Sequence, residues 1–496
     1  MIDAGGPRRR GRIHLAIVTT SAIGVLTVTG SCRGPQPQTG APSSAVLRVG
    51  LGQGPATNPL VGLRQLSQIL SVEGLARTGE DGRMQPSMAA GWTVGTDLRS
   101  LAVRLRPNMK FHDGTAVDAD VVARMLPDAM RAYMGSVFSD VAHVTPTGRD
   151  TLDIAFHTSS GFLTEVLESA IQKPGGIGTG PFIGPAKGTT AMEANHDYYL
   201  GSPIVQRLQV ESFPTTRTAW AEMLRGGIDM LYEVGPDALP SMQNSSSISV
   251  FTFTRRYQYV LVLNPDTPAL RAAEVRQALS RGLDRGEIVR SALNGYGVVS
   301  DGPIWPRYWA VSPDLPKFQF DPARAAATLG HTLTFSCLVP PDAPFERIAL
   351  EVKRQLSAVG VEMTPEEVSL NDLTQRAAKR QYEAMLIEVI SGPTLLRPYL
   401  IWHSNTPLNW GQFGNASVDS ALDRVRHAAG DDDLRGAIKG LQQTFMDDPP
   451  AVFLAWSVRA RAVSKRFIVP TPEAGREILS NLRLWKPSGD QQAGRN

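Results

Sequence analysis

The chain has 496 residues, of which 42% are hydrophobic and 20% are charged, and its formal net charge at pH 7 is +3. This length predicts two or three domains, and the composition is that of an ordinary globular protein. Part of the positive charge comes from four arginines between positions 8 and 12. The remainder is close to neutral, so we expect no nucleic-acid partner, because such proteins carry a basic patch.

The N-terminus has the layout of an export signal. The basic run is followed by the mostly apolar segment Leu15–Val28, then by small residues and Cys32. The apolar segment is shorter than a membrane-spanning helix requires. A cysteine at this point resembles a bacterial lipoprotein signal, although Thr29 stands where such signals usually have leucine. We therefore expect residues 1–32 to be a signal with a lipid anchor on Cys32, with an ordinary cleaved signal or an uncleaved anchor as the alternatives.

The cysteine and histidine content predicts neither a disulfide nor a metal site. If Cys32 is acylated, Cys337 has no partner, and its apolar surroundings predict a buried small side chain. No cysteine and histidine residues lie at zinc-ligand spacing, so we expect no metal and no cofactor. The polar, Pro- and Gly-rich residues 33–45 predict a flexible tether.

The first elements of the fold follow from short patterns. A strand is expected from residue 46, then a Gly-rich loop over 50–58 and a helix over 63–75. Alternating apolar and polar residues over 101–106 predict a half-buried strand. The pair Asp113-Gly114 predicts a tight turn. Thr115 or Asp118 can cap the helix that follows.

The rest of the chain alternates between strands and helices, which predicts an α/β fold. Asp284 falls near the end of one helix and is read as a capping residue rather than a catalytic acid. The expected strands cover 205–213, 228–230, 257–264, 333–339, 360–363 and 382–390, with a strand pair at 451–463. The expected helices cover 219–226, 345–359 and 370–379, and a further helix has residues 275, 278, 279 and 283 on one face.

The run Val72–Met125 carries a family resemblance. It contains "EGL", an acidic-Gly turn, "PSMAAGW", "KFHDG" and "DADVV" in that order. This run resembles the extracytoplasmic solute-binding proteins of peptide- and nickel-type ABC importers, family 5. Two further blocks, over 176–201 and 257–289, are similar to the same family. The glycines at 176–180 lack the Lys-Ser/Thr of a P-loop, which excludes a phosphate loop.

The resemblance implies a periplasmic-binding-protein-like, two-lobed α/β fold of type II with an extra domain. We expect the lobes to move about a hinge near 176–182 and 260–266. The expected divisions are lobe I in three pieces (46–78, 177–262 and 451–486), the extra domain (79–176), lobe II (263–450) and a disordered tail (487–496).

Nothing in the sequence indicates an enzyme. The eight histidines are scattered, and no Gly-x-Ser-x-Gly nucleophile motif is present. The resemblance implies instead a monomeric solute-binding component of an ABC importer, anchored outside the membrane. It would capture a peptide, metal chelate or oligosaccharide and deliver it to the permease subunits. The alternative is a cell-envelope lipoprotein of the same fold that acts as a sensor or assembly factor without import.

The resemblance also implies where ligand binds: the loop over 53–58, the aromatic residues of the strand over 257–264, and the segment over 391–411. Aromatic rings supply apolar walls, and an arginine can grip a carboxylate with two hydrogen bonds. The tryptophans could equally be core residues. The candidate ligand-binding residues are Gln53, Asn58, Tyr257, Tyr259, Arg397, Trp402, His403 and Trp410.

One departure from the family bears on the ligand. Peptide-binding relatives commonly carry "W..D..DP" after the strand, and the aspartate pairs with the free amine of the peptide. Here the segment Glu388–Pro393 has neither the tryptophan nor the aspartate, and Glu388 lies inside the expected strand. An unpaired ammonium in a closed site is costly. We therefore expect free-amine peptides to bind worse than an anionic or blocked solute.

Overall fold

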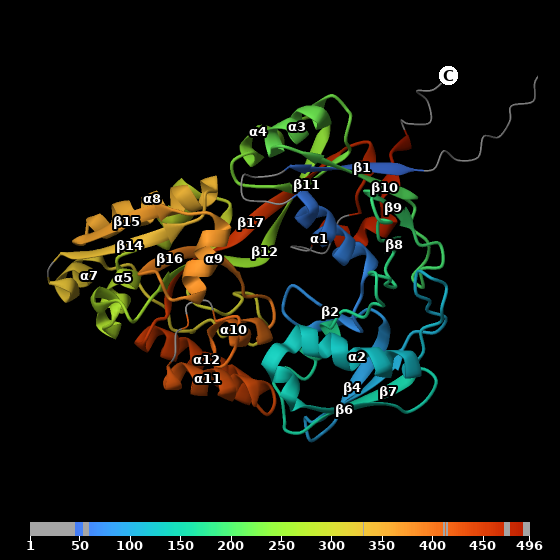
Figure 1. Ribbon diagram of the computed structural model, residues 1–496, viewed down its shortest axis with the longest axis horizontal. Helices are drawn as coiled ribbons and strands as arrows, with labels where there is room; N and C mark the ends of the chain where they lie inside the picture. Colours follow the sequence, from blue (N-terminus) through green and yellow to red (C-terminus); the bar gives the residue numbers. More distant parts are fainter. Residues whose placement is uncertain are drawn as a thin grey trace, which may run out of the picture. The chain divides into compact units, whose positions relative to one another are not determined.

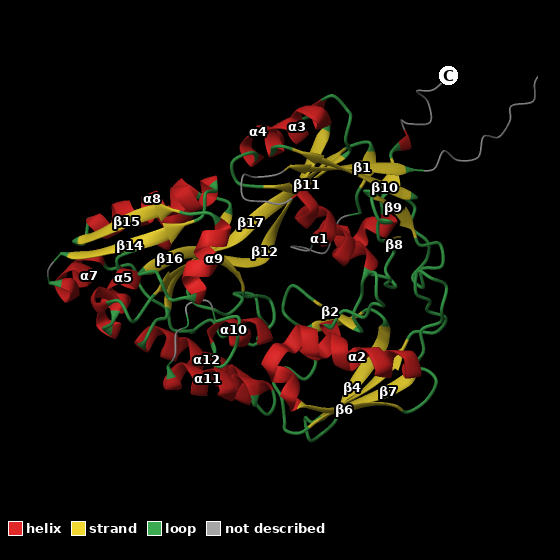
Figure 2. Cartoon of the chain, in the orientation of Figure 1, coloured by secondary structure: helices red, strands yellow, loops and turns green. Residues whose placement is uncertain are grey.

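The computed structural model describes residues 45–52, 59–330, 332–409, 412, 415–470 and 477–489. Within these ranges the chain forms an 11-stranded mixed sheet, a four-stranded antiparallel sheet and two short two-stranded ladders, with helices packed against the sheets (Figures 1 and 2). The α/β class expected from the sequence is confirmed.

The large sheet has the order β15-β14-β16-β12-β17-β11-β1-β10-β9-β8, and β13 pairs with β17. Its strands are β1 (Val46–Gly52), β8 (Phe182–Ile183), β9 (Ala191–Ala194), β10 (Arg207–Phe213), β11 (Met230–Val234), β12 (Ile248–Leu263), β13 (Gly297–Val299), β14 (Leu333–Val339), β15 (Val361–Glu367), β16 (Ala384–Ile390) and β17 (Ala451–Ser464).

Helices cover both ends of this sheet. In Figure 1, α5, α7 and α8 pack around β14 and β15, and they share one apolar core with these strands. The α-helices are α1 (Pro59–Ser71), α2 (Ala119–Met134), α3 (Thr216–Leu224), α4 (Leu239–Gln243), α5 (Ala273–Arg281), α6 (Arg285–Glu287), α7 (Pro322–Leu329), α8 (Ala343–Ser357), α9 (Leu370–Ala378), α10 (Leu396–Trp402), α11 (Ala416–Arg426) and α12 (Asp431–Asp447).

The strands β12 and β17 connect the two ends of the large sheet. They pair with each other along most of their length, while β12 also pairs with β16, and β17 with β11 and β13. The expectation of a strand pair at 451–463 was wrong. The segment forms the single strand β17, which pairs with β12, β11 and β13 and contains no turn. The β12–β17 register shifts between Thr254 and Gln258, which releases two consecutive arginines from the regular ladder.

The four-stranded sheet belongs to the segment expected as an extra domain. It consists of β4 (Ala89–Val94), β5 (Ser100–Leu105), β6 (Val141–Pro146) and β7 (Thr151–Phe156), and α2 packs on it. In β5 the buried and exposed side chains alternate as the pattern predicted. The Asp118 side chain caps α2 by accepting from Val121 N at 2.9 Å, and Gly114 adopts a positive φ of 82° in the preceding turn.

Helix α1 ends earlier than expected. It stops at Ser71 rather than at 75, because Glu73 pairs as an isolated bridge with Ile171. The Glu73 carboxylate accepts hydrogen bonds from four hydroxyl groups, contributed by Ser87, Thr179, Tyr198 and Tyr199. The first family-like block therefore forms a polar junction with the loop over 176–182 and the segment after β9.

Two glycines of that loop allow a close backbone approach. A Cβ atom on Gly178 would lie 2.0 Å from the carbonyl oxygen of Ser71, and one on Gly180 would lie 2.4 Å from that of Leu70. Neither contact is possible for a larger residue, so the loop is glycine-rich because it crosses the end of α1.

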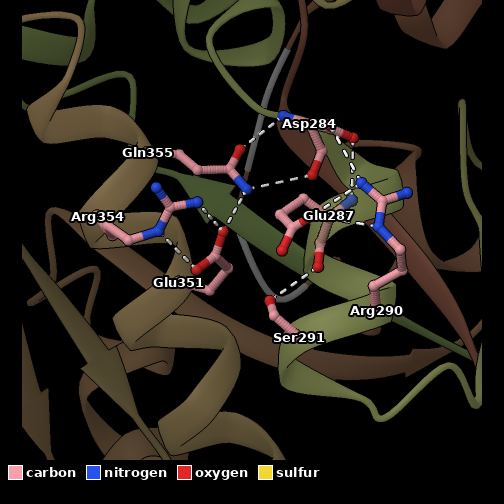
Figure 3. A network of polar contacts seen from close by, with 7 residues as sticks. All are labelled: Asp284, Glu287, Arg290, Ser291, Glu351, Arg354 and Gln355. Carbon is pink, nitrogen blue, oxygen red and sulfur yellow. Dashed lines mark hydrogen bonds and ion pairs between the residues drawn. The ribbon is translucent and has the colours of Figure 1, made fainter.

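Asp284 is a capping residue, as expected. Its carboxylate accepts from Glu287 N at 3.0 Å at the start of α6, and its backbone N–H donates to Gln355 of α8 at 2.6 Å. Figure 3 shows the cap within α6 and the contact of Asp284 with Gln355 of α8, together with the local ion pairs of Arg290 with Glu287 and of Arg354 with Glu351. The contact with Gln355 joins the start of α6 to α8.

Several smaller expectations are settled by the described residues. Cys337 is fully buried, as predicted, and burial raises the pKa of its thiol to about 12. The tail was expected to begin at 487, but Lys486–Pro487 form strand β19, which pairs with β18 (Phe467–Ile468). No helix in the described ranges has the length and apolar character needed to span a membrane.

Candidate ligand-binding site

A partly exposed polar cluster surrounds Glu168, the last residue of the short helix η2 (Glu165–Glu168). One carboxylate oxygen accepts from the Thr78 hydroxyl at 2.6 Å and from the Tyr133 hydroxyl at 3.0 Å. The other accepts from Arg256 Nη1 at 2.9 Å. All the strong acceptor positions of Glu168 are therefore occupied by the protein itself.

Four separate elements bring these side chains together. Thr78 ends β2 (Ala76–Thr78), which pairs with β3 (Met84–Pro86). Tyr133 lies in the last turn of α2. Arg256 lies at the register shift of β12, and its Nη2 also donates to the carbonyl of Thr78 at 3.3 Å. The cluster thus joins the hairpin, the extra-domain helix and the long central strand.

The cluster keeps Glu168 ionised. Burial opposes ionisation, but the Arg256 guanidinium and the hydrogen bonds from Thr78 and Tyr133 outweigh it, so the pKa of Glu168 lies below its usual value. The Arg256 side chain is 44% exposed and that of Glu168 is 19% exposed. The ion pair is therefore in contact with solvent on the Arg256 side.

Arg397 adds a second arginine to the cluster. It lies on α10, and its Cζ atom sits 4.9 Å from the centre of the Tyr133 ring. Among the described residues it forms no ion pair, whereas Arg256 beside it is paired with Glu168. A guanidinium held against an aromatic face and lacking a carboxylate partner suits a ligand that brings its own acidic group.

Glu165 lies beneath the cluster and is 2% exposed. Its carboxylate accepts from the backbone N–H groups of Leu395 and Leu396, at 2.8 and 2.9 Å. Burial raises the pKa of Glu165 to about 7, against the opposite influence of these two N–H groups and of Arg397.

Three candidates from the sequence are buried in the protein core. Trp402 is 2% exposed and packs edge-on against Phe445 and Phe453. His403 is 6% exposed and stacks on Tyr399. Tyr259 is fully buried, and its hydroxyl accepts from Arg459 Nη2 at 3.0 Å. These placements stabilise the fold and leave little surface for a ligand.

Of the five remaining candidates, the structure describes Tyr257 and Arg397. Tyr257 is partly exposed, and the Arg255 guanidinium lies 4.3 Å from the centre of its ring. Arg397 belongs to the Glu168 cluster. The other three candidate ligand residues and the expected lipidation site lie outside the described residues: Gln53, Asn58, Trp410 and Cys32.

Glu388 lies inside β16, as expected, and is committed to ion pairs. Arg255 Nη1 donates to both of its carboxylate oxygens, at 3.1 and 2.9 Å. Arg459 lies 3.9 Å from Glu388 and 3.5 Å from Glu233. Burial opposes ionisation of Glu388, but Arg255 and Arg459 lower its pKa. Its negative charge is therefore already neutralised by the protein.

Sequence reasoning missed Thr78, Tyr133, Glu168 and Arg256. One signal was available: two adjacent arginines interrupt the otherwise apolar and hydroxyl-rich strand "FTFTRRYQYVLVL". Charged residues in the middle of a long strand need partners: Arg256 pairs with Glu168 of this cluster, and Arg255 pairs with Glu388. The other three residues lie far apart in sequence and meet only through the fold.

The described residues contain no group of three or more histidine, cysteine or acidic side chains placed to hold a metal ion. Two surface depressions lie away from the cluster, one along α8 and the other over β4 and β5. The cluster itself consists of arginine and tyrosine side chains, a threonine hydroxyl and the Glu168 carboxylate.

The chain belongs to the bacterial extracellular solute-binding proteins of family 5, whose middle-region model matches residues 83–410. It is 23% identical to the oligopeptide-binding protein AppA of Bacillus subtilis, over 71% of this chain and 74% of that protein. It is 21% identical to the glutathione-binding protein GsiB of Pectobacterium atrosepticum, over 79% of this chain and 84% of that one.

Solved structures share the fold. That of NikZ from Campylobacter jejuni in complex with Ni(L-His) matches with a TM-score of 0.75 at 20% identity, covering 89% of this chain and 99% of that chain. The fold is therefore that of the two-lobed periplasmic binding proteins, as the sequence predicted. Members of the family are binding proteins that work outside the cytoplasm.

Proposed function

We propose that this solute-binding protein captures a small anionic or N-blocked solute at the Glu168 cluster and delivers it to an ABC permease. Arg397 would grip the acidic group of the solute, Tyr133 would pack against its body, and Arg256 would lie at its edge. Tyr257 and the loop residues Gln53 and Asn58 are proposed to complete the site. The observation that carries this proposal is that Arg397 forms no ion pair among the described residues, while Tyr133, whose ring it faces, donates to the already occupied Glu168.

The occupied state of Glu168 supports the choice of ligand. A free amine needs an acidic partner, and Glu168 already accepts from Thr78, Tyr133 and Arg256. Glu388 is held by Arg255. An ammonium group would have to displace one of these donors, and the displaced group would lose its partner at a cost of about 1–3 kcal/mol. An acidic group on Arg397 displaces nothing.

The relatives leave the solute class open. Their names specify oligopeptides and glutathione, and the NikZ structure contains Ni(L-His). A fold of this kind does not determine what is bound, so the charge of the site has to guide the choice. We propose import because family relatives covering most of this chain are solute-binding proteins. A sensor or assembly factor of the same fold is the second candidate, and loss of uptake on gene deletion would distinguish the two.

A thermal-shift screen against a mixed library tests the site and the ligand class together. The library pairs di- and tripeptides with their N-acetylated forms and adds organic acids and metal chelates. Binding to the native state raises the melting temperature. We expect blocked or acidic members to stabilise the wild-type protein and not Arg397→Ala. Arg424→Ala is the matched control, because Arg424 is exposed on α11 outside the cluster.

Strong stabilisation by free-amine dipeptides that is unchanged in Arg397→Ala would refute both the site and the ligand preference. Stabilisation by an acidic solute that is equally strong in Arg397→Ala would refute the site alone.

We also propose that Cys32 anchors the protein to the outer side of the membrane. The support is the sequence order of a basic run, an apolar segment and small residues before this cysteine. Residues 33–45 would form the tether, followed by the lobes and extra domain with the boundaries expected from the sequence.

A further inference from the structure

We propose that Glu165 is a positioning residue, which fastens the start of α10 to the extra domain and thereby sets the place of Arg397 in the site. This inference rests on the proposed function, because it concerns the same arginine. It goes beyond that function by coupling ligand recognition to a contact between two distant segments of the chain and to the protonation of one carboxyl group.

The geometry of the contact is that of a capping interaction supplied from elsewhere. The first N–H groups of a helix lack partners within the helix, and Leu395 at the start of α10 offers no side-chain cap. Both oxygens of Glu165, a residue 230 positions away from Leu395, accept from this first turn. Arg397 follows directly, so removing the carboxylate loosens the turn that carries it.

Two further contacts lie nearby, one to α10 and one to α11. The rings of Phe162 and Tyr399 meet edge-on at 5.7 Å, and Arg426 Nε donates to Asp140 at 2.8 Å. These contacts lie further along the interface, and neither involves the first turn of α10. Glu165 is therefore the group that holds the backbone turn before Arg397, while the Tyr133 ring contacts its guanidinium.

Charged and titratable groups face Glu165 from every element packed around it. Glu168 lies on the same short helix and Arg397 on α10, while Tyr133 of α2 and Tyr308 of the segment after β13 also interact with it. Burial dominates and raises the pKa of Glu165 to about 7. A raised carboxyl pKa means that the folded contact favours the protonated form. The stabilisation is complete below the ordinary glutamate value and is lost as pH rises through about 7.

Hydrogen exchange tests this coupling without a ligand. The full-length protein and its variants Glu165→Gln and Glu165→Ala are compared at about pH 5.5 and about pH 8.5, with exchange corrected for the intrinsic pH dependence. The measured quantity is the protection of the amides of Leu395 and Leu396, relative to amides in β5 of the same sample. Glu193→Gln is the control, because its side chain is 55% exposed on β9.

We expect wild-type protection to fall by about tenfold between the two pH values, since one pKa unit corresponds to that factor. Glu165→Gln should show no such fall, Glu165→Ala should be weakly protected at both pH values, and Glu193→Gln should behave as wild type. Equal protection in all four proteins, or a pH dependence that persists in Glu165→Gln, would overturn the inference. If Glu165→Ala does not fold, the comparison with the nearly isosteric Glu165→Gln still decides.

The two proposals fail separately. If a solute stabilises Arg397→Ala as strongly as the wild-type protein, the proposed site is refuted, but the hydrogen-exchange result is unaffected. Unchanged exchange in the Glu165 variants would remove the coupling and leave the solute site intact.

Discussion

Four charged residues neutralise one another where β12 and β17 run side by side. Glu233, Arg255, Glu388 and Arg459 come from four adjacent strands, and the side chains of the two arginines and of Glu388 are at most 17% exposed. Burying charges is tolerated when each has a partner, and removing one partner leaves the other uncompensated. The two adjacent arginines therefore have different partners: Arg255 belongs to this network, while Arg256 pairs with Glu168.

The variant Glu388→Gln should lower the free energy of unfolding at pH 7 by about 2–4 kcal/mol, because it leaves Arg255 without its strongest partner. The pKa of Glu388 is lowered in the fold, so its contribution is present above the ordinary glutamate value and is lost as pH falls below it. Denaturant titrations at neutral and acidic pH measure the difference. A deficit that stays constant on acidification would contradict the assignment.

At the scale of elements, the sequence predicted most strands and helices to within a few residues. The strand at 333–339 was predicted with both its ends correct, and the Asp118 and Asp284 caps were identified because capping follows from local residue types. The ligand cluster was not predictable in this way. Thr78, Tyr133, Glu168 and Arg256 occupy four elements, and only tertiary packing brings them within hydrogen-bonding distance.

The same limit explains the errors. The end of α1 at Ser71 is set by the long-range pairing of Glu73 with Ile171 and by four hydroxyl donors. Tryptophan is a residue type that binding sites often use, but Trp402 packs between Phe445 and Phe453. Residue type alone does not distinguish an aromatic wall of a site from an aromatic member of the core.

A pair of glycine substitutions tests the close approach of the 176–182 loop to α1. Gly178→Ala should destabilise the protein by about 2 kcal/mol or more, because the added Cβ meets the Ser71 carbonyl oxygen. Gly436→Ala is the matched control in α12, where the added Cβ meets nothing within 4 Å; it should be neutral or stabilising by up to about 1 kcal/mol. Melting temperatures report both, and equal effects would contradict the packing of the loop.

At the scale of the whole molecule, β12 and β17 join the expected lobes through one continuous sheet. A ligand changes the relation between lobes only through contacts that one arrangement makes and another lacks. A solute bound at Arg397 between the expected lobes would supply such contacts. We therefore expect X-ray scattering to record a smaller radius of gyration at saturating solute, and identical scattering curves would contradict closure.

Anchoring through Cys32 gives a separate prediction for the intact protein in cells. Cys32→Ala should release the protein from the membrane fraction, because the variant cannot carry the acyl chains proposed as the anchor. More than one chain is expected at this residue, since a single acyl chain binds membranes only marginally. Detergent-free washing followed by fractionation measures the effect. Retention of the variant on the membrane would show that the apolar segment over 15–28 acts as an uncleaved anchor.

The central claim is that a small solute binds reversibly at Arg397. Isothermal titration of the most stabilising library member into wild-type protein, Arg397→Ala and Arg424→Ala tests it most directly. We predict one saturable site per chain. The affinity should fall by about tenfold or more in Arg397→Ala, because a charged hydrogen bond contributes about 1.5–3 kcal/mol. Arg424→Ala should bind with wild-type affinity. Absence of saturable binding, or equal affinities in all three proteins, would contradict it.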